Sequence, residues 1–250
     1  MTTVLRGRKV LVTGGSSGIG AATALALARR DCEVVVTGRD ERALRAVAAR
    51  TGAHPLAADL CSPEGLARLV EEAGPPDVLI NNAGLGWSGT TEAMPGTEVR
   101  RLLAVNLAAP VELTRMLLPA MRSRGGGHIV FVSSIATVGV GSEAVYSATK
   151  AGLRAFAAAL RDELDGQHVA VTTVFPGAVR TPFFRRRGQE YTRSFPRMLP
   201  PEEVAERMLR AVERGEQECF LPRWLGLACR ANGLLPGTFH RLSRWFGPTS

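Results

Sequence analysis

The sequence contains few of the side chains from which metal sites and disulfide frameworks are built. Its 250 residues include only four cysteines and four histidines. Neither residue type shows C-x-x-C or mixed Cys/His spacing, so we expect no metal site. The first residues lead almost directly into an apolar strand, which leaves no room for a secretion signal. We therefore expect reduced thiols and a cytoplasmic protein.

Long apolar runs and clustered charge are also missing. No run of eighteen apolar residues occurs, so we expect no membrane-spanning helix. The formal net charge is +8, but the arginines are scattered along the chain, apart from Arg185, Arg186 and Arg187. Scattered basic residues with few interleaved aromatics do not indicate a nucleic-acid-binding protein. A phosphate-bearing ligand would need only a few of these charges.

Strand-like and helix-like runs alternate along most of the chain. The strand-like runs are continuous and apolar, and they lie at 9–14, 33–38, 54–60, 77–84, 128–134, 169–177 and 218–222. The runs between them are amphipathic helices. This pattern predicts a Rossmann-type α/β fold, in which a doubly wound parallel sheet is the middle layer of a three-layer α/β/α sandwich. We expect one domain at 1–222, including an irregular substrate loop at 183–199, and an amphipathic tail at 223–250.

Three glycines fall at the first strand-to-helix junction, in TGGSSGIG at 13–20. Gly14, Gly18 and Gly20 would allow a tight turn and a close approach of the backbone to an anion. The helix that follows would supply free N–H groups and positive potential. Because the cluster follows the first strand, it predicts a dinucleotide-binding loop.

The end of the second strand bears on which dinucleotide binds. NAD-binding sites place an acidic residue there, which accepts hydrogen bonds from the ribose 2′-hydroxyl. Here Gly38 occupies that position and Arg39 follows it. A guanidinium suits a 2′-phosphate, so the sequence favours NADP(H) over NAD(H). Asp40 is an alternative ribose ligand, or the N-cap of the next helix.

One of only two tyrosines and one of only two lysines stand four residues apart in SEAVYSATKAGL at 142–153. Tyr146 and Lys150 would therefore lie on one helix face. A free tyrosine has a pKa of about 10, and we expect the ammonium to lower the pKa of Tyr146 toward neutrality. Lys150 could also hold ribose hydroxyls. The alternative is a surface lysine beside a half-buried tyrosine.

The chain resembles the short-chain dehydrogenase/reductase family over roughly residues 7–220. TGGSSGIG resembles the family's TG-x-x-x-G-x-G loop, NNAG at 81–84 matches a second motif, and YSATK at 146–150 is similar to its Y-x-x-x-K motif. Three shorter signatures also match: DL at 59–60, the asparagine of AVNLAAP, and PG at 176–177 with the threonine at 181. The motifs occur in the family's order and on the expected elements.

The resemblance implies a catalytic tetrad of Asn106, Ser134, Tyr146 and Lys150. Tyr146 would exchange a proton with the substrate oxygen, and Lys150 would lower the tyrosine pKa and hold the nicotinamide ribose. Ser134 would orient the carbonyl, and Asn106 would support a water that passes protons to Lys150. The implied cofactor-binding residues are Gly14, Ser16, Ser17, Gly18, Ile19, Gly20, Arg39, Asp59, Leu60, Asn82, Ala83, Gly84, Tyr146, Lys150, Pro176, Gly177, Val179 and Thr181.

Two adjacent serines compete for one place in the tetrad. The family's common spacing to the tyrosine selects Ser133, whereas the motif at the strand end selects Ser134, with one residue deleted from the loop. Neighbours in a strand face opposite sides, so only one can reach the carbonyl. We select Ser134, because loops vary in length more readily than strand ends.

Substrate choice is expected in the loops beyond the strands. Residues 85–87, 138–145 and 183–199 are mostly apolar or aromatic, which indicates a lipophilic carbonyl or alcohol of steroid-like, retinoid-like, fatty-acyl or polyketide type. The three consecutive arginines are expected to be a solvated face, or a surface for an acidic carrier protein. The tail interleaves aromatic residues and leucines with arginines, which indicates peripheral membrane contact or, alternatively, a lid or dimer contact.

These observations predict an NADP(H)-dependent oxidoreductase that acts on a carbonyl or secondary alcohol and binds no nucleic acid. We expect a homodimer or homotetramer that pairs through the helices at 97–122 and 144–164. An NAD-dependent 3-hydroxy dehydrogenase and a non-catalytic dinucleotide sensor of the same fold are the alternatives.

Overall fold

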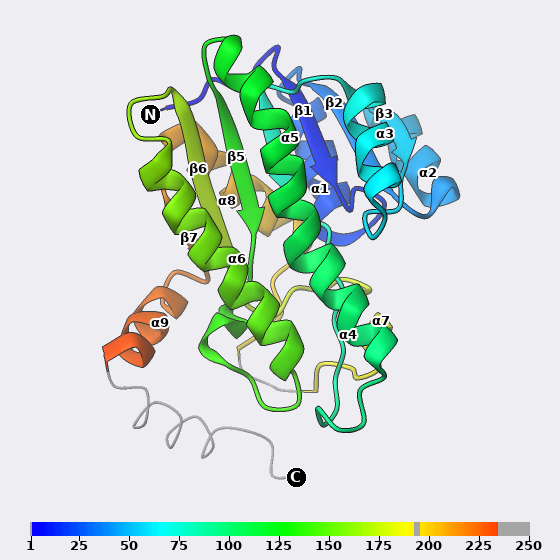
Figure 1. The fold of residues 1–250 in the computed structure, drawn as a ribbon, viewed down its shortest axis with the longest axis vertical. Coiled ribbons are helices and arrows are strands. Elements are labelled where there is room, and N and C mark those ends of the chain that lie inside the picture. Colours follow the sequence, from blue (N-terminus) through cyan, green and yellow to red (C-terminus); the bar gives the residue numbers. More distant parts are fainter. Residues whose placement is uncertain (1, 193–195, 235–250) are drawn as a thin grey trace.

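The computed structural model describes residues 2–192 and 196–234, which form a sheet of seven parallel strands between layers of helices (Figure 1). The strands are β1 (Lys9–Thr13), β2 (Glu33–Gly38), β3 (His54–Ala57), β4 (Val78–Asn81), β5 (Gly127–Val132), β6 (Val169–Pro176) and β7 (Glu218–Leu221). Their spatial order is β3-β2-β1-β4-β5-β6-β7, and neighbouring strands are parallel. This confirms the predicted Rossmann-type sandwich, with its switch point between β1 and β4.

Two sets of helices cover the two faces of the sheet. One face packs against α1 (Gly18–Ala28), α2 (Glu41–Thr51) and α8 (Pro201–Arg214), and the other packs against α3 (Pro63–Ala73), α5 (Ala109–Ser123) and α6 (Ala144–Glu163). Alternate residues of β1 enter the two cores, with Val10 and Val12 on the first face and Leu11 on the second. Both faces are buried, which is why the middle of the strand, Val10 to Val12, is apolar.

Short polar residues begin the helices that the sequence predicts. The Ser62 hydroxyl accepts a hydrogen bond from the Gly65 amide at 2.9 Å, and Pro63 takes the first helical position of α3. The Asp40 carboxylate accepts one from the Ala43 amide at 2.9 Å at the start of α2. These caps fix where the connections over the carboxyl edge of the sheet end and the helices begin.

The helix predicted at 97–122 is continuous in direction but not uniform. It consists of α4 (Gly96–Leu103), a π-helical turn, η1 (Ala104–Ala108), and α5. By length and mean hydropathy, 1.3, the run Gly96–Ser123 could cross a membrane, but 44% of that window is buried within the fold. Packing against the sheet and α6 accounts for its apolar side.

Three short helices lie near the carboxyl edge of the sheet or beyond it. They are η2 (Ile135–Val138), α7 (Phe183–Arg186) within the predicted substrate loop, and α9 (Leu225–Leu234), which contacts η2 and β7. Figure 1 shows the arrowheads of the strands pointing toward the end of the molecule where α4 and α7 lie. Of the predicted tail, residues 235–250 lie outside the described residues.

Candidate active site

The predicted site residues gather at the carboxyl edge of the sheet. The glycine-rich loop follows β1, Arg39 follows β2, the Asp59–Leu60 pair lies beyond β3, the NNAG turn ends β4, and Ser134 follows β5. Pro176 ends β6, and Thr181 lies in the connection after it. Tyr146 and Lys150 come from α6, and Asn106 comes from η1. Residues that are far apart in the sequence therefore lie along one edge of the sheet, on both sides of the switch point.

The glycine-rich loop is too tightly packed to accept side chains at Gly14, Gly15 and Gly20. A Cβ on Gly14 would lie 2.8 Å from the Ala83 Cα, and one on Gly20 would lie 2.2 Å from the Gly14 carbonyl oxygen. Gly18 has a φ of 57°, which disfavours other residues. Ser17 is the N-cap of α1, yet its side chain does not cap the helix. The first amides of α1 thus remain available for an anion.

The NNAG turn is fastened to this loop through Thr13. The Thr13 hydroxyl oxygen accepts hydrogen bonds from the Asn82 and Ala83 amides, each at 3.0 Å. The Asn82 side-chain amide donates to the Thr13 carbonyl at 2.8 Å. The second asparagine of the motif therefore holds β1 and β4 together at the switch point, which leaves the backbone of Gly84 to face the crevice.

The end of β2 offers no carboxylate for a ribose. A Cβ on Gly38 would lie 3.3 Å from the Ser16 hydroxyl, so a longer side chain here would crowd the loop. The carboxylate of Asp40 is engaged as the cap of α2, as one of the two sequence interpretations anticipated. Arg39 is exposed, and within the described residues it has no hydrogen-bond or ion-pair partner. Its guanidinium is free to bind an anion.

Two of the predicted cofactor residues could act only through their backbone. The side chains of Leu60 and Val179 are buried in the two cores, at 7% and 5% exposure. Asp59 is exposed and accepts a hydrogen bond from the Cys61 amide at 3.0 Å. Thr181 lies against the glycine-rich loop, because a Cβ on Gly18 would be 3.0 Å from its methyl group.

Tyr146 is 8% exposed and lies in a third apolar cluster with Met94 and Leu102. Burial raises its pKa to about 12, and the Ser134 hydroxyl partly offsets this increase through a side-chain hydrogen bond. The expectation that Lys150 would lower this pKa toward neutrality is wrong for the structure as it stands. Removal of the phenol from water outweighs the neighbouring charges, so the hydroxyl stays protonated at neutral pH.

Lys150 lies on the same face of α6 and is 3% exposed. Its Nζ donates to the Val132 carbonyl at 2.9 Å and lies 5.8 Å from the Tyr146 ring centroid. Burial lowers its pKa to about 8. The interpretation of Lys150 as a surface lysine is therefore wrong, and a buried cation stands one helical turn from the phenol.

The two serines after β5 face different partners, as neighbours in an extended segment do. The Ser133 hydroxyl donates to the Lys150 backbone carbonyl at 3.1 Å, and the residue is buried. The Ser134 hydroxyl accepts from the Ala136 amide at 3.1 Å and hydrogen-bonds to Tyr146. The structure therefore places Ser134 beside the phenol and Ser133 in the packing between β5 and α6.

Asn106 is fully buried in the π-helical turn η1. Its side-chain oxygen accepts from the Leu85 amide at 2.8 Å, and its Nδ2 donates to the Leu85 carbonyl at 2.9 Å. A Cβ on Gly84 would come within 3.6 Å of the Lys150 Nζ and 3.7 Å of the Asn106 Oδ1. Asn106 thus fixes the chain after the NNAG turn next to Lys150, with Gly84 close to both side chains.

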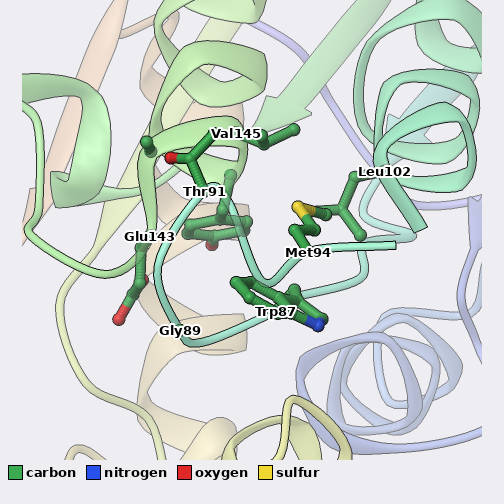
Figure 2. A pocket seen from close by; sticks show the side chains of 9 residues that line it. Trp87, Gly89, Thr91, Met94, Leu102, Glu143 and Val145 are labelled. Carbon is green, nitrogen blue, oxygen red and sulfur yellow. The ribbon is translucent and has the colours of Figure 1, made fainter. Parts of the chain in front are cut away.

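A narrow pocket adjoins Tyr146, and its walls leave no room for a water molecule between them. Figure 2 shows Trp87 and Met94 together beneath Leu102, with Glu143 at the opposite edge. Trp87 and the residues just before Tyr146 lie in segments predicted to contact the substrate, whereas Met94, Leu102 and Thr91 were not predicted from the sequence. Glu143 precedes Tyr146 by three residues, and this helical spacing was the signal available for it.

Glu143 forms a buried ion pair with Arg187, whose side chain is 8% exposed. The guanidinium also lies 4.7 Å from the Phe184 ring centroid. The three consecutive arginines are therefore not one solvated face. Arg187 is buried, Arg186 donates to the Ser17 hydroxyl at 3.2 Å, and Arg185 is exposed.

These features fit a dinucleotide. Free amides begin α1 beside a glycine-rich loop, and Arg39, which has no ion-pair partner among the described residues, follows β2. The backbone of Gly84 lies close to the Lys150 ammonium. In the described part of the chain, no group of three or more His, Cys, Asp or Glu side chains could hold a metal ion.

Comparison with known proteins agrees with this arrangement. The family pattern described as short chain dehydrogenase matches residues 8–192. A ketoacyl reductase, HetN, from Nostoc sp. is 35% identical over 98% of this chain and 91% of its own length. A short-chain dehydrogenase from Sphingobium yanoikuyae, solved in complex with NADPH, is 32% identical with a TM-score of 0.81, over 92% of this chain and 95% of that one. A 3-ketoacyl-(acyl-carrier-protein) reductase from Brucella melitensis, complexed with NADH, is 28% identical with a TM-score of 0.80, over 87% and 97%.

Proposed function

Because the chain belongs to the short-chain dehydrogenase/reductase family, whose members are NAD(P)-dependent oxidoreductases acting on CH–OH groups, we propose that it is an NADP(H)-dependent reductase of carbonyls on lipophilic acyl or polyketide chains. The observation that carries the proposal is the contact of Ser134 with the buried phenol of Tyr146, one helical turn from the buried ammonium of Lys150.

The side chains of the protein donate a proton to the substrate oxygen and stabilise the charge that this leaves on the protein. A nicotinamide cofactor, when bound, would supply the hydride for the reduction. Tyr146, protonated at neutral pH because burial raises its pKa to about 12, donates its proton to the carbonyl oxygen as that oxygen gains charge. Ser134 donates a hydrogen bond that orients the same oxygen. The Lys150 ammonium stabilises the phenolate that remains, and Asn106 keeps the adjoining backbone in place.

The choice of NADP(H) rests on the end of β2. Arg39 is unpaired among the described residues, Gly38 brings no negative charge, and Asp40 is engaged in capping α2. A 2′-phosphate would therefore meet a cation and no carboxylate acceptor. The relative in complex with NADPH supports this choice, whereas the reductase complexed with NADH supports NAD(H) as the alternative cofactor.

The substrate class rests on the pocket beside Tyr146. Its side chains are mostly apolar, and its walls lie so close together that they leave no room for a water molecule. A linear chain suits this width better than a steroid skeleton. The ketoacyl reductase from Nostoc points to the same class, a keto group on an acyl chain.

The proposal includes a cytoplasmic homodimer or homotetramer and a peripheral membrane contact through the tail. Support for the membrane contact comes from α9 and the residues before it, where Trp224 is 42% and Leu227 is 69% exposed beside the exposed Arg223 and Arg230. Liposome flotation of the full chain and of a folded chain ending at Pro222 tests the contact. Failure of both to float would contradict it. Light scattering of the full chain tests the assembly.

The catalytic proposal is tested with purified protein, a series of 3-ketoacyl thioesters and both reduced cofactors. We expect keto reduction with NADPH, and a Kd for NADPH below that for NADH. Arg39→Asp should raise the Kd for NADPH by roughly 10- to 100-fold, because a charge-assisted contact is lost and a repulsion is added. No reduction of any carbonyl in the series, together with binding of neither nucleotide, would contradict the proposed function. An unchanged preference in Arg39→Asp would contradict the account of β2 alone.

A further inference from the structure

The short helix α7 and the residue after it provide two arginines that have no role in the proposed reaction. Its last residue, Arg186, and the next residue, Arg187, point to opposite ends of the active site. Arg187 pairs with Glu143 at the start of the catalytic helix α6, whereas Arg186 reaches Ser17 at the start of α1. One segment therefore connects the chemical end of the crevice with its phosphate-binding end.

Several contacts fix this segment against the site. The Phe183 ring centroid lies 5.5 Å from that of Tyr146, and a Cβ on Gly86 would come within 2.6 Å of the Phe183 ring. Thr181, two residues earlier, packs against Gly18 of the glycine-rich loop. The ion pair of Arg187 anchors the other end of α7. The direction in which Arg186 extends is thus set by packing on both sides.

The surroundings of Arg186 favour an anion. Its Nη1 donates to the Ser17 hydroxyl at 3.2 Å, and Ser17 is the N-cap of the eleven-residue helix α1, whose first turn contains no acidic residue. The first amides of α1 have no acceptor within the helix, and they carry the positive end of its dipole. A neutral hydroxyl is a weak partner for a guanidinium, and Arg186 has no ion pair among the described residues. A phosphate at this helix start would be within reach of both the amides and Arg186.

We propose that Arg186, in the predicted substrate loop at 183–199, is a ligand of the cofactor phosphates. It binds the diphosphate common to NADPH and NADH rather than the 2′-phosphate. This inference rests on the proposed function, since it requires a nicotinamide dinucleotide in the crevice. The substrate loop would then bind the cofactor as well as the substrate. A diphosphate bound by Arg186 would add one more contact that holds α7 beside Tyr146.

The test measures nucleotide affinity rather than turnover. Dissociation constants for NADPH and NADH are determined by calorimetry for the wild-type chain, Arg186→Ala, Arg186→Lys and Arg185→Ala. Arg185 is the matched control, because it is exposed and lies in the same helix. We expect Arg186→Ala to raise both dissociation constants by about 10-fold. Arg186→Lys should recover part of the loss, and Arg185→Ala should change neither constant by more than about twofold.

Each other outcome is decisive. If the wild-type chain binds NADPH but Arg186→Ala binds both nucleotides with unchanged affinity, the inference is wrong while the proposed function stands. If Arg186→Ala weakens binding of NADPH alone, as is expected of Arg39→Asp, the assignment to the diphosphate is wrong. If the wild-type chain binds neither nucleotide, both the inference and the proposed function fail. Equal thermal stability of the four proteins shows that the exposed substitutions leave the fold intact.

Discussion

Substitution of the two adjacent serines separates a catalytic hydroxyl from a structural one. Ser134 hydrogen-bonds to Tyr146, while Ser133 donates to the Lys150 carbonyl at 3.1 Å within the packing of α6. Ser→Ala removes one oxygen in each case. The pair of variants is therefore matched in chemistry and differs only in what the hydroxyl contacts.

The two substitutions should affect different properties: Ser133→Ala the stability of the fold, and Ser134→Ala the rate of catalysis. Ser133→Ala removes one buried hydrogen bond between neutral groups, so the free energy of unfolding should fall by about 1 kcal/mol and the Tm by roughly 2–4 °C. Its kcat should stay within about threefold of wild type. Ser134→Ala removes a donor aimed at the substrate oxygen, and kcat should fall by roughly 100- to 1,000-fold. Its Tm should change little, because the hydroxyl caps only the short helix η2.

The pH dependence of alcohol oxidation is a second test of the Ser134 assignment, because it reports the pKa of Tyr146. The Ser134 hydrogen bond lowers the pKa of Tyr146, so its loss should move the rise in alcohol oxidation to higher pH, and Ser134→Thr should restore the wild-type position. Steady-state rates of cofactor oxidation and reduction across pH measure both effects, with nucleotide Kd values as the control. A larger loss of kcat in Ser133→Ala than in Ser134→Ala would refute the assignment.

Three further predictions concern buried polar groups. Burial lowers the pKa of His128 from 6.5 to about 4. Between these pH values the imidazole is protonated in the unfolded chain and neutral in the folded protein, so a fall in pH favours unfolding. We expect the free energy of unfolding to have its highest value above pH 6.5 and to fall by roughly 3 kcal/mol toward pH 4. Urea unfolding of wild type and His128→Gln checks this, and an equally steep pH dependence in the variant would contradict it. Lys150 has a pKa of about 8, so kcat for reduction should decline above that pH, and Lys150→Met should be at least about 100-fold slower at every pH tested. Asn106→Ala leaves the Leu85 amide and carbonyl without their partner, so we expect a loss of about 2–4 kcal/mol in unfolding free energy, and a stability equal to wild type would show that Asn106 does not clamp this turn.

Much of the fold was predictable because its signals are local. Continuous apolar strands between amphipathic helices require a parallel sheet covered on both faces, and Ser62, Pro63 and Asp40 mark helix starts wherever the chain folds. The gathering of the candidate site residues at the carboxyl edge follows from the direction of parallel strands. The side of the crevice that Ser133 or Ser134 faces follows from strand alternation, once the register is known.

The remaining features depend on contacts between distant parts of the chain. The π-helical turn at Asn106 has no distinct sequence pattern, because its extra residue is stabilised by the bonds to Leu85. Spacing showed that Lys150 is near Tyr146, but the rise in the tyrosine pKa comes from its burial under distant residues such as Phe183. Likewise, three consecutive arginines look like one charged face until the partners Glu143 and Ser17 are placed.

The central claim is that the buried phenol of Tyr146 donates the proton in carbonyl reduction, and Tyr146→Phe tests it most directly. The variant keeps the ring and its packing and removes only the hydroxyl. With NADPH affinity measured on the same sample, the account predicts a Kd within about twofold of wild type and a kcat lower by at least about 100-fold. Reduction at the wild-type rate, with nucleotide binding intact, would contradict it.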